Sequence, residues 1–250
     1  MPGGHTPLPV PECHPWLASA SAGAESLDCE IVNVSLTESE QLAAALRRDF
    51  PNVTASADRA WSRAPAVRVI DCVLSLHRDY DEFVVPRLEA FERRFPAVET
   101  ILQLRALINS YRSPAAFAND ALNYNDPSRA ALLRAVVEYL VRTALVAQGP
   151  ELEQLKAWAE HARPQDYLTL RIPGFALAGF QYLRMLFGAN TTKPDVHISR
   201  YVAHAVGHSV SDVQALLLLE DAGRLAGLRL RDIDTTIWEN TARDHHGGTV

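Results

Sequence analysis

The residues best suited to chemistry lie between positions 165 and 205. Asp195 follows Pro194 and opens a segment with helical apolar spacing, so we expect its carboxylate to cap a helix N-terminus. The partial positive charge at a helix N-terminus holds such a carboxylate ionised and in place. A fixed carboxylate can stabilise positive charge on a substrate, or orient and deprotonate a water molecule. Asp195 is therefore the candidate catalytic residue.

A tight turn precedes this aspartate by about one helix. The sequence Ile-Pro-Gly at 172–174 separates a short helix from a second helix, and Gly174 can turn the chain without a Cβ clash. The hairpin is expected to point backbone N–H groups outward from a helix N-terminus, which suits a phosphate oxygen. Residues 165–204 carry four basic and two acidic side chains, whereas the whole chain has a net charge of −6. The sequence thus predicts a mildly basic site in an acidic protein.

Composition and charge limit the classes of function. The chain has 250 residues, 48% of them hydrophobic, which suits one large domain or two small interleaved ones. Its pI near 5.8 argues against a protein that coats nucleic acid through bulk charge. The apolar runs are far shorter than the roughly 20 residues of a membrane span, and residues 1–23 lack Lys and Arg. We expect a soluble, cytoplasmic protein without membrane contact.

The three cysteines do not indicate a metal site or a disulfide framework. They are widely spaced and form no Cys-x-x-Cys pair. His204 and His208 share a helix face, but Gly207 lies between them and no Glu completes a His-Glu-x-x-His pattern. We therefore expect no metal and no cofactor.

The elements that must position these residues are helices. Residues 1–35 are rich in Pro, Gly and Ser and predict a loosely ordered arm, followed by one domain over 36–250. Thr37 and Glu40 predict a capping box for a helix that reaches about Arg48. From Ala66 the apolar spacing is helical almost to the end, without strand alternation. The expected architecture is an all-α bundle of about ten helices. The later helices are expected near 98–111, 114–122, 128–147, 150–162, 165–171, 175–187, 195–207, 210–226 and 231–242.

Two motifs carry a resemblance to a known family. Ile-Pro-Gly-Phe-Ala at 172–176 and Lys-Pro-Asp-Val-His-Ile-Ser-Arg at 193–200 are separated by one helix. They resemble the Leu-Pro-Gly-Val-Gly hairpin and the downstream Val-Asp-Thr-His-Ile-x-Arg of endonuclease III-like enzymes in the helix-hairpin-helix DNA glycosylase superfamily. A weaker similarity covers residues 66–242. The resemblance implies a two-lobed helical fold with a helix-hairpin-helix motif at 165–187 and an active-site cleft between the lobes.

The resemblance also implies an activity and its residues. Asp195 would be the catalytic carboxylate that promotes release of a damaged or modified base, flipped out of double-stranded DNA. His77 stands where the family has a DNA-facing Gln, and Tyr182 and Lys193 would belong to the base pocket; Tyr80, Tyr124 and Tyr201 are further aromatic candidates. The hairpin would offer the backbone of four residues to a DNA phosphate: Gly174, Phe175, Ala176 and Ala178.

Three departures from the family pattern limit the type of glycosylase that the resemblance implies. Ala176 replaces the second hairpin Gly, Ala178 replaces the lysine of the lyase-type members, and the four-cysteine iron–sulfur loop is absent. The resemblance thus implies a monofunctional, metal-free glycosylase. The alternative is a catalytically silent descendant that binds DNA or a protein partner, because helix-hairpin-helix units also serve as noncatalytic grips. A third possibility is a purely structural helical domain whose hairpin binds nothing.

Overall fold

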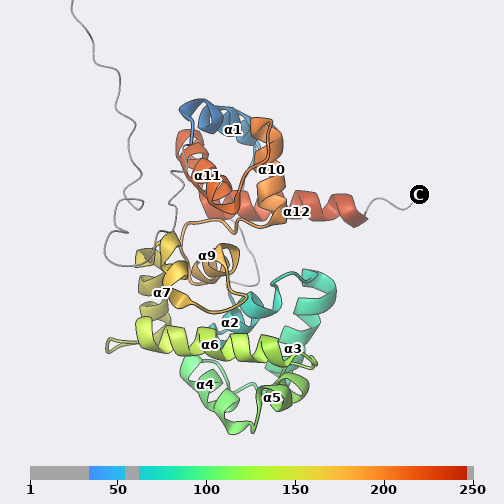
Figure 1. Cartoon of the computed structure of the whole chain (residues 1–250), viewed down its shortest axis with the longest axis vertical. Helices are drawn as coiled ribbons and strands as arrows, with labels where there is room; N and C mark the ends of the chain where they lie inside the picture. Colours follow the sequence, from blue (N-terminus) through green and yellow to red (C-terminus); the bar gives the residue numbers. More distant parts are fainter. Residues whose placement is uncertain (1–33, 54–61, 247–250) are drawn as a thin grey trace, which may run out of the picture. The chain divides into compact units, whose positions relative to one another are not determined.

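A computed structural model of the chain describes residues 34–53 and 62–246 (Figure 1). These residues form twelve α-helices and no strand, which confirms the all-α fold class. Of the arm expected at 1–35, residues 1–33 lie outside the described ranges. The helices are α1 (Leu36–Asp49), α2 (Pro65–Leu74), α3 (Val85–Arg94), α4 (Ile101–Ser110), α5 (Pro114–Ala121), α6 (Pro127–Thr143), α7 (Glu151–His161), α8 (Tyr167–Leu170), α9 (Leu177–Leu186), α10 (Val196–Val206), α11 (Asp212–Ala226) and α12 (Leu230–His246).

Helix boundaries follow from capping residues and prolines. Side-chain oxygens accept a backbone N–H of the first turn in α4, α5, α6 and α11, where the caps are Thr100, Ser113, Asp126 and Ser211. Proline opens α2, α5 and α6, because its fixed φ suits the first helical position and no N–H is needed there. Glycines in the left-handed conformation end α10 and α11. Local sequence therefore sets most helix ends.

Two local features differ from expectation. The capping box predicted at Thr37 and Glu40 is wrong, because Ser35 caps α1 and its N–H donates to Glu38 Oε2 at 3.1 Å. The same Ser-x-x-Glu pattern lies two residues earlier and starts the helix that buries Leu42 and Leu46. A single π-helical turn at Tyr80–Val84 also precedes α3, where the apolar spacing predicted a regular helix.

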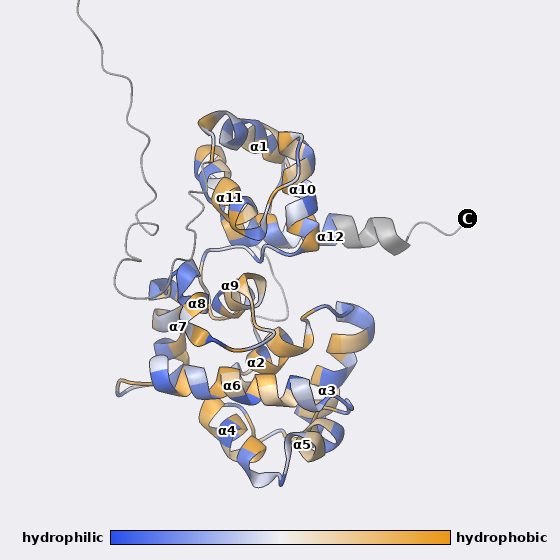
Figure 2. Ribbon diagram, in the orientation of Figure 1, coloured by the Kyte–Doolittle hydropathy of each residue, from blue (hydrophilic) through white to orange (hydrophobic). Residues whose placement is uncertain are grey.

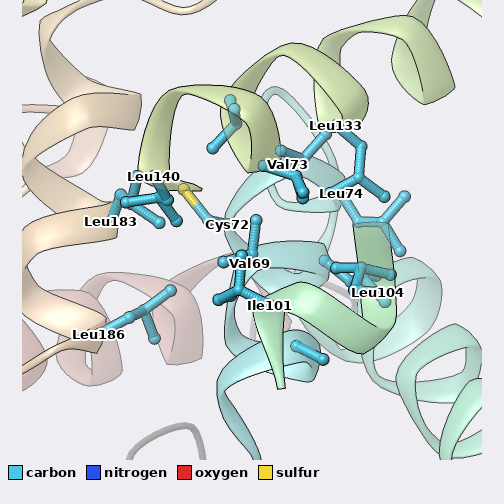
Figure 3. Close-up of a cluster of buried hydrophobic side chains, with 14 of the residues drawn as sticks. Val69, Cys72, Val73, Leu74, Ile101, Leu104, Leu133, Leu140, Leu183 and Leu186 are labelled. Atoms are coloured by element: carbon cyan, nitrogen blue, oxygen red, sulfur yellow. The ribbon is translucent and has the colours of Figure 1, made fainter. Parts of the chain in front are cut away.

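The larger hydrophobic cluster is built by α2 through α9. The helix α6 packs against α2, α4 and α5, and α9 packs against α2 and α7. Figure 3 shows the centre of this cluster, where Val69, Cys72 and Val73 of α2 lie among leucines of α4, α6 and α9. Because α2 is buried on almost all sides, any polar side chain on it must find partners inside the protein.

A second hydrophobic cluster joins the two ends of the described chain. The first helix, α1, packs against α10 and α11, and α10 packs against α12. In Figure 1 this places the blue α1 beside the orange α10 and α11. Leu42 and Leu46 of α1 are fully buried there, with Ile198, Leu219 and Ile237 in the same cluster. The N-terminal helix is therefore part of the packing that supports α10, which begins directly after Asp195.

Polar and apolar residues are interspersed along the helices of both clusters (Figure 2). Among the described residues, no helix combines the length and the apolar character needed to cross a membrane.

The packing of α1 generates a stability prediction. Leu46 is fully buried, whereas Leu36 on the same helix is 68% exposed. Leu46→Ala should lower the free energy of unfolding by about 2–5 kcal/mol because it leaves a cavity. The matched Leu36→Ala change should cost less than about 0.5 kcal/mol. Urea denaturation of both variants measures the two values, and equal losses would contradict this packing of α1.

Candidate functional site

The hairpin before α9 turns through two left-handed residues. Arg171 ends α8 with φ of 48°, and Gly174 has φ of 80°. A Cβ at Gly174 would meet no atom within 4 Å, so the backbone conformation and not crowding favours glycine there. The Phe175 N–H donates to the Ile172 carbonyl oxygen at 3.1 Å and closes the turn.

The four hairpin residues have different exposures. Gly174 and Ala176 are exposed, Ala178 is half-buried in the first turn of α9, and the Phe175 side chain is buried. A Cβ on Gly179 would lie 3.0 Å from the Phe175 ring, so glycine at 179 permits the close contact of this ring with α9. The buried ring thus anchors a hairpin whose neighbouring backbone is exposed. Because the first N–H groups of a helix have no acceptor within it, donors are available at the start of α9.

Asp195 is the N-cap of α10, as the sequence predicts. Its Oδ1 accepts the N–H of His197 at 2.9 Å and that of Ile198 at 3.3 Å. Its Oδ2 lies 3.7 Å from Lys193 Nζ, and its side chain is 21% exposed. One oxygen is thus held by the helix N-terminus, and the other faces a cation.

Lys193 connects Asp195 to Tyr182. The Lys193 ammonium lies 4.6 Å from the centroid of the Tyr182 ring, a cation–π contact, and its side chain is only 19% exposed. The structure therefore brings together three of the residues that the sequence selected. Two of them, Lys193 and Asp195, lie on one short segment, and the third lies on α9.

Asp71, which sequence reasoning missed, accepts a hydrogen bond from Tyr182. This α2 residue is fully buried, and its Oδ1 accepts the Tyr182 hydroxyl at 3.1 Å. Its Oδ2 accepts the Tyr80 hydroxyl at 2.9 Å, and the Tyr80 ring meets Trp238 of α12 edge-on at 5.9 Å. A signal was present in the sequence, because Asp71 is the one charged residue in the apolar run Val69–Leu74. A charge at such a position needs specific partners.

Asp234 of α12 is a second buried carboxylate that sequence reasoning missed. Its Oδ2 accepts the Thr192 hydroxyl at 2.6 Å and the Lys193 backbone N–H at 2.7 Å. Burial raises the pKa of Asp234 to about 7, and the charge of Asp195 adds to the rise, whereas the two hydrogen bonds and Lys193 oppose it. Because this pKa is raised above that of an unfolded aspartate, the stability contribution of protonated Asp234 is lost as the pH rises through about 7.

Other candidates lie apart from this group. His77 is exposed, with a left-handed φ of 55°, and no described contact joins it to Asp195, Lys193 or Tyr182. Tyr124 packs edge-on against Phe83. Tyr201 packs against Phe50 and donates to Asp49 Oδ2 at 3.1 Å. Of the four tyrosines proposed for the pocket, Tyr80 and Tyr182 therefore share one partner, and the other two belong to separate contacts.

Among the described residues, the histidines named as possible metal ligands belong to no group of three ligating side chains. His208 Nε2 lies 2.7 Å from Glu38 Oε1, a contact between the turn that follows α10 and α1. Within residues 34–53 and 62–246, no three His, Cys, Asp or Glu side chains are placed to hold one metal ion.

Asp195, Lys193 and Tyr182 all lie in the part of the chain that matches a family model. The chain belongs to the family described as Domain of unknown function (DUF8548), over residues 40–242. No curated protein and no solved structure matches it significantly.

The Asp71 contacts generate a second stability prediction. Tyr182→Phe removes a hydroxyl that donates to a buried carboxylate, so we expect a loss of about 1–3 kcal/mol in the free energy of unfolding. Tyr167→Phe is the matched control, because Tyr167 is half-buried and its hydroxyl makes none of the described hydrogen bonds. Chemical denaturation compares the variants, and similar losses in both would show that the Asp71 contact contributes nothing.

Proposed function

We propose that this chain is a DNA glycosylase of the helix-hairpin-helix type, which hydrolyses the N-glycosidic bond of a damaged or modified base. The observation that carries the proposal is the placement of Asp195. Its carboxylate caps α10, its second oxygen faces Lys193, and Lys193 lies over the Tyr182 ring. An aspartate that only caps a helix requires neither a neighbouring cation such as Lys193 nor an aromatic ring such as Tyr182. Double-stranded DNA as the substrate would place the protein in the cytoplasm, with the nucleoid.

The hairpin would bind DNA through its backbone. In this proposal α8, the turn at 171–174 and α9 form a helix-hairpin-helix motif, and the N–H groups near Gly174, Ala176 and Ala178 bind a phosphate oxygen. The positive φ of Gly174 and the exposure of Gly174 and Ala176 support this role. Phosphate contacts of this kind set the register of the protein on the duplex without selecting a base sequence.

The active-site cleft would lie between two lobes that correspond to the two hydrophobic clusters. The segment from Gly188 to Asp195 links α9, in the larger cluster, to α10, in the second cluster. Helices of both clusters contact this segment, since Tyr182 of α9 meets Lys193 and Asp234 of α12 binds Thr192. This arrangement supports a site that takes one wall from each lobe.

Asp195 would act on the charge that develops as the bond to the base breaks. Departure of the base leaves positive charge on the sugar, and a preorganised carboxylate stabilises it without reorganising at the moment of reaction. The same carboxylate would orient and deprotonate the water that adds to the sugar carbon. The fixed Oδ1 supports this role, because two backbone N–H groups hold the carboxylate in one orientation.

Tyr182 and Lys193 would form part of the pocket for the extruded base. Extrusion costs a few kcal/mol, which stacking on an aromatic ring offsets in part. Lys193, which faces Asp195 and lies over the Tyr182 ring, would stabilise negative charge on the departing base. Ala178 occupies the hairpin position of the family's lysine, which forms the Schiff base in the lyase-type members, so the proposed enzyme is monofunctional.

Base release tests the proposal. Duplex oligonucleotides with alkylated, oxidised, deaminated or mismatched bases are incubated with the protein, and abasic sites are revealed by hot alkali. We expect cleavage of at least one substrate only after alkali.

Asp195→Asn should lower the rate of base release by roughly a hundredfold or more. Asn caps helices about as well as Asp, so the variant should fold. Asp126→Asn, the same change at the cap of α6, is the matched control and should keep the rate.

Two other outcomes would change the assignment. Salt-sensitive DNA binding without release of any base would favour a catalytically silent DNA-binding member of the fold. Strand cleavage without alkali, with a covalent adduct trapped by borohydride, would contradict the monofunctional assignment. The chain contains only two lysines, so loss of the adduct in Lys193→Arg but not in Lys156→Arg would identify the amine.

A further inference from the structure

The segment between α9 and α10 is held by one side chain of α12. Asp234 accepts the Thr192 hydroxyl at 2.6 Å and the Lys193 N–H at 2.7 Å on the same oxygen. Thr192 is fully buried, and Asp234 is 9% exposed. Because these groups are out of water, the hydrogen bonds between them replace those that water would make.

We propose that Asp234 is a positioning residue for the Asp195 site, which sets where the Asp195 carboxylate and the Lys193 ammonium lie. This inference rests on the proposed function for the reaction that it affects. Asp234 would touch neither the base nor the sugar, and would act through the Thr192–Asp195 segment.

Hydrogen bonds at the N–H and at the carbonyl oxygen of Lys193 connect Asp234 to Asp195. The Lys193 N–H donates to Asp234, and the Lys193 carbonyl oxygen accepts the Asp195 N–H at 2.7 Å. The Asp195 side chain then binds the N–H groups at the start of α10. Residue 193 is thus held at both its N–H and its carbonyl, so its side chain leaves the backbone at a fixed place beside Asp195.

The charges around Asp234 act in opposite directions, since Asp195 opposes the charged form of Asp234 and Lys193 favours it. Asp195 and Lys193, both on the segment, are the charged groups that act on Asp234, and its charged neighbours along α12 are Arg231 and Asp232. The Lys193 side chain faces Asp195, whereas its backbone N–H donates to Asp234. A buried carboxylate without donors is costly, so Asp234 selects the conformation of the segment that supplies them.

Two substitutions of Asp234 distinguish the loss of its hydrogen-bond acceptor from the loss of its charge, and a control substitution on α12 measures any general loss of stability. Asp234→Ala removes the acceptor, whereas Asp234→Asn keeps a carbonyl oxygen for both donors.

On the substrate found by base release, Asp234→Ala should lower the single-turnover rate roughly ten- to a hundredfold, because displacement of a catalytic group by about 1 Å has that effect. The Kd for DNA should stay within about twofold, since hairpin contacts are unchanged. Asp234→Asn should restore most of the rate. Glu239→Ala, an exposed change on α12, is the matched control.

A second pair of variants keeps the test valid if Asp234→Ala does not fold. Thr192→Val removes one donor and Thr192→Ser keeps it, so the first should slow base release and the second should not. A wild-type rate in Asp234→Ala or Thr192→Val, or an equal defect in Asp234→Asn and Asp234→Ala, would overturn the positioning role.

Amide hydrogen exchange at Lys193 separates this inference from the proposed function. The Lys193 N–H should exchange slowly in the wild type and in Asp234→Asn, and faster in Asp234→Ala or Thr192→Val. If the wild type releases no base, the glycosylase proposal fails, and the exchange rates alone decide whether Asp234 holds the segment. Equal exchange in all variants would show that it does not.

Discussion

Two carboxylates that are buried among apolar helices impose the constraint on which the site depends. Removing a carboxylate from water is costly unless donors replace the lost hydration. Asp71 obtains donors from Tyr80 and Tyr182, and Asp234 obtains them from Thr192 and Lys193. The groups that satisfy these carboxylates also form or hold the candidate site. Folding and the placement of the site are therefore linked, since a conformation that misplaces the site also leaves a buried carboxyl group without hydrogen-bond partners.

Much of the fold could be predicted because helix ends are encoded locally. Prolines and capping residues mark them, and apolar spacing marks the buried faces, so each helix expected between residues 98 and 242 has a counterpart in the structure. The error at α1 arose where Ser35 and Thr37 both have a glutamate three residues later, and only packing distinguishes them. The π-helical turn at Tyr80–Val84 has no signature in the apolar spacing, because that spacing marks buried faces and not the hydrogen-bond pattern of a single turn.

The site was predictable where its chemistry is local. Asp195 could be recognised as a cap because its hydrogen bonds reach only two and three residues ahead. The contact of Tyr182 with Asp71 spans 111 residues, and that of Thr192 with Asp234 spans 42, so no short motif contains them. A charged residue in an apolar helix was the available signal for Asp71. His77, selected through the family resemblance, lies on an exposed turn, and its role stays a prediction.

The central claim is that the Asp195 carboxylate stabilises positive charge on a sugar. The most direct measurement compares the Kd for two duplexes with abasic-site analogues, one with a cationic pyrrolidine ring and one with a neutral tetrahydrofuran ring. Because an enzyme binds mimics of its transition state more tightly than neutral analogues, we expect a preference of about a hundredfold or more for the cationic ring. The preference should disappear in Asp195→Asn. Equal affinity of the wild type for the two duplexes, or a preference that survives Asp195→Asn, would contradict the account.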